Sequence, residues 1–426
     1  MLTTKIIAKT RDCIELSADE IQHMVNGITD GSIPDYQISA WAMAVLCRGI
    51  SEAETATLTT AMLDSGQRLP RCSDRPRVDK HSTGGLGDKT SLILAPLLAC
   101  FDLDVPMLSG RGLGITGGTL DKLEAYPGYR CNLSIEEVNK QLNSIGCVIT
   151  GTTQSIAPAD KKLYALRDVS STVPSVALIT ASIMSKKLAE TLDALVLDVK
   201  WGSGAFMQTI DKAKELQASL VRTGRRVGVA TSSLLTDMNQ PLGKMVGNAC
   251  EVNESMEVLE GQGPEDVTKL TVELCIPLLV DTKRAANVDE ARRALHEAIQ
   301  DGQALDRYRT MIEAQGGKFA DRLPLARVHE VTAGRAGYID SFDGQSLGHC
   351  VVEMGGGRRQ QQDPINHQVG LEMLAKIGTK VEVGQPIIRF FFDGSSGQVE
   401  QIANQIAASV SIMDQAPPLS SLIVNH

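Results

Sequence analysis

The sequence lacks the features of a membrane protein and of a nucleic-acid-binding protein. No apolar run reaches the roughly 20 residues of a membrane-spanning helix, and the stretch 90–101 fits a buried helix better. No basic run is long enough to follow a nucleic-acid backbone, and 51 acidic against 42 basic side chains give a net charge of −9. Residues 1–20 carry charges every few positions and no apolar core of a signal peptide. We therefore expect no membrane, no nucleic acid and no secretory leader.

Cysteine and histidine also form no pattern typical of a disulfide framework or a metal site. The nine cysteines are scattered, and none forms a Cys-x-x-Cys pair. An odd number of unpaired cysteines favours free thiols in a reducing compartment, so we expect a cytoplasmic protein. The seven histidines include no spaced pair of metal ligands, so a zinc site is not expected. With 42% hydrophobic and 22% charged residues, the 426-residue chain has the composition of a globular protein with two or three lobes.

Helix start signals and the spacing of apolar residues predict the helices and strands in the first half of the chain. Ser17 with Glu20, and Ser51 with Glu54, match capping boxes, which predicts helices over residues 1–65. After a polar link, short apolar strands alternate with helices, and this alternation predicts a largely parallel α/β sheet. A further helical region, interrupted near Pro174, is expected to pack with the N-terminal helices.

Later segments complete the predicted organisation. Strands are expected at 194–199 and 227–231, and two long helical stretches over 248–315. Short strands separated by Gly, Asp and Pro then predict a small β-rich α+β lobe. The predicted fold is thus an α/β protein with an all-α domain, in which a small helical domain packs against a large mixed α/β domain. The domain boundaries are 1–65 with 159–192 (helical), 76–158 with 193–329 (α/β) and 330–426 (C-terminal lobe).

Two glycine-rich loops, residues 80–91 and 109–119, offer the strongest chemical pattern. Glycines let backbone N–H groups converge on an anion, and the helix that follows each loop adds a favourable dipole. Hydroxyl and cationic side chains interleave with these glycines, which predicts a phosphate site. A dinucleotide-binding Gly-x-Gly-x-x-Gly pattern also occurs but lacks its structural context, and Asp88 departs from a P-loop.

Other candidate residues have less specific patterns. His81 lies in the first glycine loop, where a bound phosphate would favour an imidazolium that stabilises a charged leaving group. Ser182 and Lys186 are spaced i, i+4 and share one helix face. Spacing alone leaves that face interpretable as a solvated surface. It also shows no Ser-His-Asp order and no carboxylate pair.

Longer motifs carry a family resemblance. Ser109-Gly110-Arg111-Gly112-Leu113 followed by Thr116-Gly117-Gly118-Thr119-Leu120-Asp121-Lys122-Leu123-Glu124 resembles the signature of thymidine and pyrimidine-nucleoside phosphorylases. The resemblance continues through Lys80-His81-Ser82-Thr83-Gly84-Gly85 and through the segments 159–168, 198–207, 236–240 and 354–359. It therefore spans nearly the whole chain.

The resemblance implies a homodimer with its active site between the helical and α/β domains. It implies phosphate contacts from Lys80, Ser82, Ser91, Ser109 and Thr119. It implies pyrimidine contacts from His81, Tyr164, Arg167, Ser182 and Lys186, with an apolar pocket of Leu113, Val173, Ile179 and Phe206. Of these, His81, Arg167 and Lys186 are the expected catalytic residues.

The implied reaction is the reversible phosphorolysis of pyrimidine 2′-deoxynucleosides, with inorganic phosphate as co-substrate and no required cofactor. Phosphate attacks C1′ while electron density flows into the base carbonyls, and the three catalytic residues stabilise that charge. Thymidine-selective relatives tend to carry methionine where relatives that accept uridine carry lysine. Met107 stands at this position, so thymidine is expected above uridine.

Several residues depart from the family pattern. Ile115 replaces a usual histidine, Trp201 replaces a small aliphatic residue, and Pro174 lies in an altered stretch before the base-binding helix. Lys89 stands where some relatives supply a potassium ligand. We expect its ammonium to stand in partly for the ion, although potassium can still be expected at Gly87, Leu242, Met245 and Glu254.

Three alternatives remain beside thymidine phosphorolysis. One is a broader pyrimidine-nucleoside phosphorylase. Another is a phosphoribosyltransferase, since anthranilate phosphoribosyltransferases resemble this family in fold, although that reaction needs magnesium and a placed acidic pair. The last is a catalytically weak nucleoside-binding homologue, which only the departures from the family pattern favour.

Overall fold

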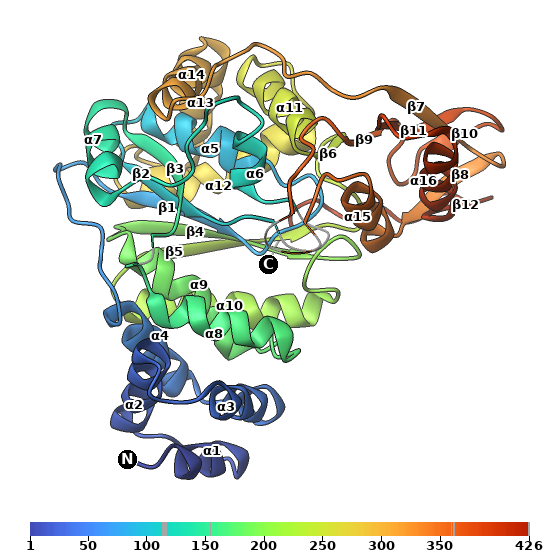
Figure 1. The fold of residues 1–426 in the computed structure, drawn as a ribbon. Coiled ribbons are helices and arrows are strands. Elements are labelled where there is room, and N and C mark those ends of the chain that lie inside the picture. Colours follow the sequence, from blue (N-terminus) through green and yellow to red (C-terminus); the bar gives the residue numbers. More distant parts are fainter. Residues whose placement is uncertain (113–116, 154, 359, 361–362, 425–426) are drawn as a thin grey trace.

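A bundle of helices opens the chain, at the bottom of Figure 1. The computed structural model describes residues 1–112, 117–153, 155–358, 360 and 363–424. The predicted capping boxes of Ser17 with Glu20 and of Ser51 with Glu54 are both present. The helices are α1 (Thr3–Arg11), α2 (Ala18–Asp30), α3 (Asp35–Arg48) and α4 (Glu52–Asp64).

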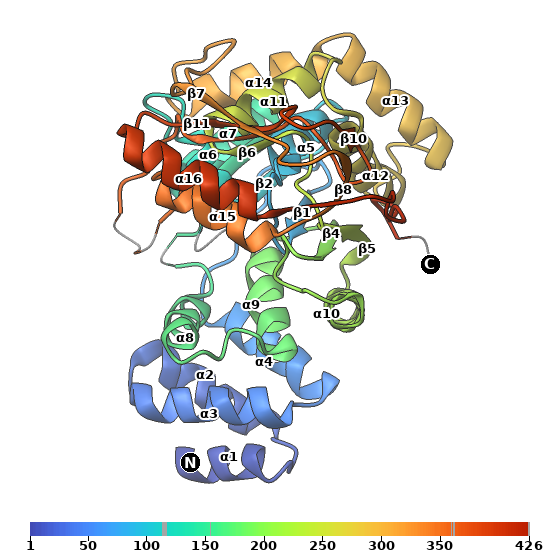
Figure 2. The same cartoon turned by 90° about the vertical axis from the view of Figure 1, so that its right-hand side faces the viewer.

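Two later helices, α8 (Pro158–Val169) and α9 (Val176–Ala189), join this bundle. Leu163 of α8 and Ala181 of α9 share a core with Ile6 and Trp41 of the N-terminal helices. Farther along α9, Leu188 belongs instead to a core formed with the sheet. Burial of each such large side chain contributes about 1.5–3 kcal/mol, so α9 is fixed to both parts. Figure 2 shows α9 rising from the bundle toward the sheet.

The central sheet is parallel, as predicted. Strand β1 pairs with β4, β4 with β5, and β2 with β3. An isolated parallel bridge between Arg77 and Asp104 joins β1 to β2, which gives the order β3-β2-β1-β4-β5. The strands are β1 (Val78–Ser82), β2 (Val105–Ser109), β3 (Cys147–Gly151), β4 (Ala194–Trp201) and β5 (Ala230–Asp237).

Helices cover this sheet, and some boundaries differ from those predicted. The region 248–315, described throughout, contains four helices rather than two, because short breaks around 261, 283 and 302 adopt positive φ. The strand expected at 227–231 begins only at Ala230, since Gly228 ends the preceding helix at φ +87°. The helices are α5 (Thr90–Ala99), α6 (Thr119–Leu123), α7 (Ile135–Ile145), α10 (Ile210–Arg226), α11 (Ala249–Leu259), α12 (Glu265–Asp281), α13 (Val288–Gln300) and α14 (Gln303–Ala314).

The C-terminal lobe is β-rich, as predicted, and lies beside the α/β domain in Figure 1. Its sheets have the orders β6-β9-β11-β7 and β10-β8-β12. The strands and helices are β6 (Met245–Gly247), β7 (Val328–Thr332), β8 (Gly337–Phe342), α15 (Gly344–Glu353), β9 (Gly370–Met373), β10 (Lys380–Val381), β11 (Pro386–Phe391), α16 (Ser396–Ala408) and β12 (Val410–Met413).

Two segments of the chain cross between this lobe and the α/β domain, and the sequence did not predict either crossing. Strand β6 comes from the α/β region yet pairs with β9 of the lobe. Conversely, the chain end returns to the central sheet, where Val424 N donates to Leu235 O at 2.9 Å. The boundary expected at residue 330 is therefore crossed in both directions. The expected fold class itself is confirmed: a helical domain, an α/β domain and a C-terminal lobe with sheets.

Candidate active site

Strand β1 places Lys80 below the carboxyl edge of the sheet, where it is 2% exposed. Its ammonium donates to Thr90 Oγ1 at 2.7 Å and to Ser91 Oγ at 3.4 Å, at the start of α5. Carboxylate oxygens of Asp88 and Asp198 lie 3.5 and 3.9 Å away. Burial lowers the pKa of Lys80, and the two carboxylates offset this in part. The arrangement holds a buried cation next to hydroxyl donors.

Further hydroxyls line the same edge. Ser82 ends β1 and Ser109 ends β2, and carboxyl ends of neighbouring parallel strands meet at one edge. Thr119 begins α6, and Lys122 of that helix donates to the Asp88 backbone oxygen at 2.6 Å. The expected phosphate residues thus lie on elements that converge. Leu113 and Ile115 fall outside the described residues.

A buried charge network supports this edge and was missed from the sequence. Asp198 and Lys200 lie two residues apart on β4, so their side chains point to the same face of the sheet. The Lys200 ammonium lies 2.7 Å from Asp198 Oδ2. Burial raises the pKa of Asp88, but the cations of Lys200, Lys80 and Lys122 outweigh it and hold that pKa well below its usual value. The signal was the Asp-x-Lys spacing at the end of the strand expected at 194–199.

The face of α9 that carries Ser182 and Lys186 is only partly exposed. Ser182 is 5% exposed, and its Oγ lies 3.1 Å from the Lys186 ammonium. That ammonium also pairs with Asp160 Oδ2 of α8 at 2.5 Å. The side chain of Lys186 keeps 29% of its surface exposed. The pair therefore offers a positioned cation and a hydroxyl from one helix face.

Arg167 on α8 holds the turn that leads into α9. The guanidinium donates to the backbone oxygens of Thr172 at 3.4 Å, Val173 at 2.6 Å and Leu178 at 3.1 Å. It is 1% exposed and lies 6.0 Å from the centre of the Tyr164 ring. Burial lowers the pKa of Arg167. In this conformation Arg167 is a structural part of the base-side turn, which the sequence did not indicate.

Phe206, Val173 and Ile179 were expected in one apolar pocket, and of these Phe206 borders a hollow that the other two do not line. Phe206 is 45% exposed and borders a hollow of about 600 Å³ that also involves residues 174–177 at the start of α9. Val173 and Ile179 are half-buried on either side of that stretch but do not line the hollow.

His81 follows Lys80 on β1, the strand that Asp79 joins to Lys187 of α9. Burial lowers the pKa of His81 well below 6.5, and the charges of Lys187, Lys186 and Lys80 lower it further. This lowering of the pKa favours the neutral ring. The imidazolium expected from the sequence was tied to a bound phosphate, and it stays a prediction.

A buried charged cluster anchors α9 on the sheet. The Lys187 ammonium pairs with Asp79 of β1, lies 2.8 Å from Glu190 Oε1, and donates to Leu108 O of β2 at 2.9 Å. Burial raises the pKa of Glu190 well above its usual value, and Asp79 raises it further. Asp79 Oδ1 and Glu190 Oε2 have no other hydrogen-bond partner. A proton on Glu190 that is donated to Asp79 satisfies both oxygens. The sequence showed no signal beyond a charged helix end.

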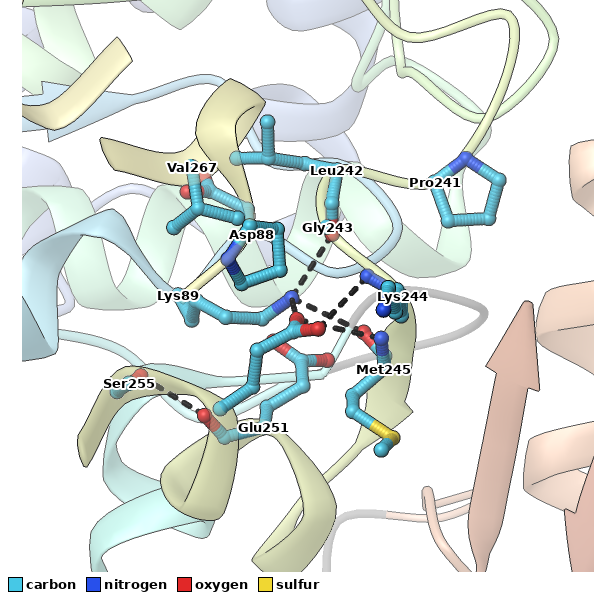
Figure 3. A network of polar contacts seen from close by, with 12 residues as sticks. Asp88, Lys89, Pro241, Leu242, Gly243, Lys244, Met245, Glu251, Ser255 and Val267 are labelled. Atoms are coloured by element: carbon cyan, nitrogen blue, oxygen red, sulfur yellow. Dashed lines mark hydrogen bonds and ion pairs between the residues drawn. The ribbon is translucent and has the colours of Figure 1, made fainter. Parts of the chain in front are cut away.

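The residues expected to bind potassium do gather in space. An ideal Cβ on Gly87 would lie 2.5 Å from Leu242 O and 3.0 Å from Met245 O, so only glycine fits beside these oxygens. The Lys89 ammonium lies between the same oxygens and Glu254 (Figure 3). Within the described residues, no group of three or more His, Cys, Asp and Glu side chains is arranged to hold a metal ion.

Matches to known families cover most of the chain. Residues 4–66 match the "Glycosyl transferase family, helical bundle domain", and residues 74–305 match the "Glycosyl transferase family, a/b domain". Residues 338–413 match the "Pyrimidine nucleoside phosphorylase C-terminal domain". Among the described residues, no helix is both long and apolar enough to cross a membrane.

Individual relatives align over nearly their full length. The pyrimidine-nucleoside phosphorylase of Bacillus subtilis (strain 168) is 43% identical over 98% of this chain and 97% of its own. That of Staphylococcus aureus (strain N315) is 42% identical over 99% of both chains. The crystal structure of anthranilate phosphoribosyltransferase from Thermus thermophilus covers 72% of this chain and 98% of its own, with a TM-score of 0.58 and 16% identity. At that identity the likeness shows the fold alone.

Proposed function

We propose that this chain, which belongs to the pyrimidine-nucleoside phosphorylase family of pentosyl-transferring enzymes, cleaves thymidine with inorganic phosphate. An oxygen of phosphate forms a bond to C1′ of the deoxyribose while the bond from C1′ to the base nitrogen breaks. The bonding electrons leave with the base, and the proton of the phosphate ends on that nitrogen. The products are thymine and 2-deoxy-α-D-ribose 1-phosphate, and the reaction is reversible.

The packing of α9 on β1 carries this proposal. Lys187 of α9 pairs with Asp79 of β1, the strand that also carries Lys80 and His81. A sugar held near His81 would thus have phosphate donors on one side and base donors on the other. Holding two reactants in this order converts a bimolecular step into an effectively unimolecular one.

The phosphate side supplies charge-assisted bonds. Lys80, Ser82, Ser91, Ser109 and Thr119 are the proposed phosphate contacts. Bonds from an ammonium to phosphate are strong, and a buried ammonium is weakly screened by water. Phosphate is itself a competent nucleophile, so no general base is required.

The base side stabilises the negative charge that develops on the pyrimidine. Lys186 and Ser182 are the proposed contacts to the base carbonyls, with His81, Arg167 and Tyr164 beside them. A preorganised cation at a developing anion acts more strongly in the transition state than in the ground state. Leu113, Val173, Ile179 and Phe206 would surround the 5-methyl group after the helical and α/β domains close on the substrate.

Selectivity for thymidine rests on Met107. This side chain is 1% exposed on β2, two residues before Ser109. A thioether is at most a weak acceptor and has no N–H or O–H to donate to a ribose 2′-hydroxyl. The second candidate is a broad pyrimidine-nucleoside phosphorylase, which the names of the B. subtilis and S. aureus relatives favour.

A single assay separates the candidates. Thymidine, deoxyuridine and uridine are incubated separately with the protein, with and without phosphate, and the free base is measured. Thymidine phosphorolysis predicts phosphate-dependent release, fastest with thymidine. A uridine rate equal to the thymidine rate would replace selectivity with the broad activity. Absence of phosphate-dependent release from all three would leave a binding homologue.

The assembly and location are also proposals. We infer a homodimer formed through the helical domain, supported by Tyr36 and Met43, which lie seven residues apart on α3 and are 73% and 40% exposed. Light scattering on the purified protein should give twice the chain mass. A cytoplasmic location is supported by the nine free cysteines and is checked by cell fractionation.

A further inference from the structure

Lys89 presents a buried ammonium to a loop of backbone oxygens. Its side chain is 0% exposed, and its nitrogen lies 2.8 Å from Leu242 O, 3.1 Å from Met245 O and 2.5 Å from Glu254 Oε2. A lysine ammonium has three N–H donors, so these three contacts satisfy it fully. Figure 3 shows the side chain directed toward this loop.

The same loop is held in place by Glu254. One of its oxygens accepts from Lys244 N at 2.8 Å, and the other accepts from Met245 N at 3.2 Å. Glu254 is 1% exposed, so its negative charge needs a buried positive partner. Burial lowers the pKa of Lys89, but Glu254 and Glu251 raise it more, and the net pKa is raised. The ammonium therefore keeps its charge at neutral pH.

Two backbone carbonyls and a carboxylate are ligands suited to a monovalent cation, which exchanges its hydration shell for such oxygens. Potassium at these residues was one expectation from the family resemblance. It does not fit here, because the Lys89 nitrogen already occupies the space between the oxygens and supplies the same single charge. A second cation there would meet the first within a few ångströms at low dielectric.

We propose that Lys89 is a tethered monovalent cation that makes the phosphate loop independent of potassium. The loop between β1 and α5 contains both Lys89 and Asp88, and Asp88 Oδ1 lies 3.5 Å from the ammonium of Lys80. A fixed charge on Lys89 thereby holds the segment that positions Lys80. A covalently attached ammonium is present at any salt composition, whereas a bound ion depends on its concentration.

Lys376 provides a matched control, because its ammonium also contacts backbone oxygens of this loop. Its ammonium lies 2.7 Å from Pro241 O, contacts Gly243 O, and pairs with Asp266 at 3.2 Å. Its side chain is 30% exposed, so water can replace the ammonium when it is removed. Loss of Lys376 should lower stability without creating a need for a particular cation.

The test measures the midpoint of thermal unfolding by circular dichroism in choline, sodium and potassium chloride at equal ionic strength. Phosphorolysis, with choline phosphate as co-substrate, is a second readout. We expect wild type and Lys376→Ala to behave alike in the three salts, within about twofold in rate. We expect Lys89→Ala to lose about tenfold or more of its rate in choline, and to regain rate and several degrees of midpoint in potassium.

Two outcomes would overturn the proposal. One is a wild-type midpoint that rises in potassium over choline, since an ion would then bind despite Lys89. The other is a folded Lys89→Ala protein whose midpoint is equal in all three salts. If that variant is insoluble in every salt, Lys89→Met takes its place, because methionine fills the space without a charge. Its unfolding midpoint must then fall below that of wild type by the same amount in all three salts. Because unfolding is measured directly, the result does not depend on the proposed reaction.

Discussion

The ammonium nitrogen of Lys186 on α9 lies 2.5 Å from Oδ2 of Asp160 on α8. This ion pair joins the two helices that carry the proposed base contacts, and it fixes the direction of a cation that remains partly exposed. A cation held in this way needs little reorganisation when charge develops on a bound base.

Removal of Lys186 should therefore affect the reaction more than the fold. For Lys186→Met we expect kcat/KM for thymidine to fall about 100-fold or more, the usual effect of losing one preorganised donor. Steady-state kinetics and thermal unfolding are measured together. Lys162→Met is the control, because Lys162 forms a looser surface pair with Asp35 at 3.5 Å. Equal loss of activity in both variants would contradict the assignment.

Arg167→Ala should, in contrast, destabilise the protein. The guanidinium is 1% exposed and donates to the backbone oxygens of Thr172 and Val173 in the turn before α9 and of Leu178 within α9, so the substitution removes three hydrogen bonds from a buried charge. A hydrogen bond to a charged group contributes about 1.5–3 kcal/mol. Urea unfolding measures the change. A variant with wild-type stability and no activity would show instead that Arg167 acts only on substrate.

The cluster of Lys187, Asp79 and Glu190 predicts unequal losses of stability for two substitutions. Lys187→Met removes the positive charge from between two buried carboxyl groups and should cost about 3–5 kcal/mol of unfolding free energy. Glu190→Gln keeps a neutral group of similar shape and should cost much less, because the raised pKa already holds Glu190 protonated. Urea unfolding of both variants checks this order. Comparable losses would show that Glu190 is ionised.

His81 predicts a pH dependence of stability. Its pKa in the folded chain is below 6.5, so the unfolded chain binds more protons between the two pKa values. Stability should therefore rise with pH across that window and be lost as pH falls below 6.5. His81→Asn should flatten this slope in urea unfolding. His367→Asn is the comparison, since burial lowers that pKa as well.

Phosphate should reverse the state of His81. A bound dianion near Lys80 favours the charged imidazole, so the pKa of His81 should move upward when phosphate is added. Nuclear magnetic resonance titration of the ring, assigned with His81→Asn, follows this directly. A pKa that stays unchanged in saturating phosphate would place the anion away from His81.

Local patterns predicted much of the fold because they depend on neighbouring residues. The boxes at Ser17 and Ser51 set helix starts, and short apolar runs set the parallel strands. The exchange of β6 into the C-terminal lobe and the return of Val424 to β5 could not be predicted, since backbone pairing between distant segments has no local sequence signal. The resemblance to pyrimidine-nucleoside phosphorylases, carried by long motifs, is confirmed by relatives that align over nearly the whole chain.

The candidate site was predicted unevenly for the same reason. The glycine loop predicted an anion site around Lys80, whereas Ser182 and Lys186 were expected at the site only from the family resemblance, because their i, i+4 spacing also fits a solvated surface. The lowered pKa of His81 depends first on burial and then on the charges of Lys187 and Lys186 from α9, and no spacing within the glycine loop encodes either. The structural role of Arg167 likewise depends on where the following turn folds back.

A crystal structure with phosphate and thymine bound together tests the central claim most directly. We predict that phosphate lies within hydrogen-bonding distance of the Lys80 ammonium and the hydroxyls at the carboxyl edge, and that a thymine carbonyl faces Lys186. Phosphate bound away from that edge, or thymine bound away from the face of α9, would contradict the account.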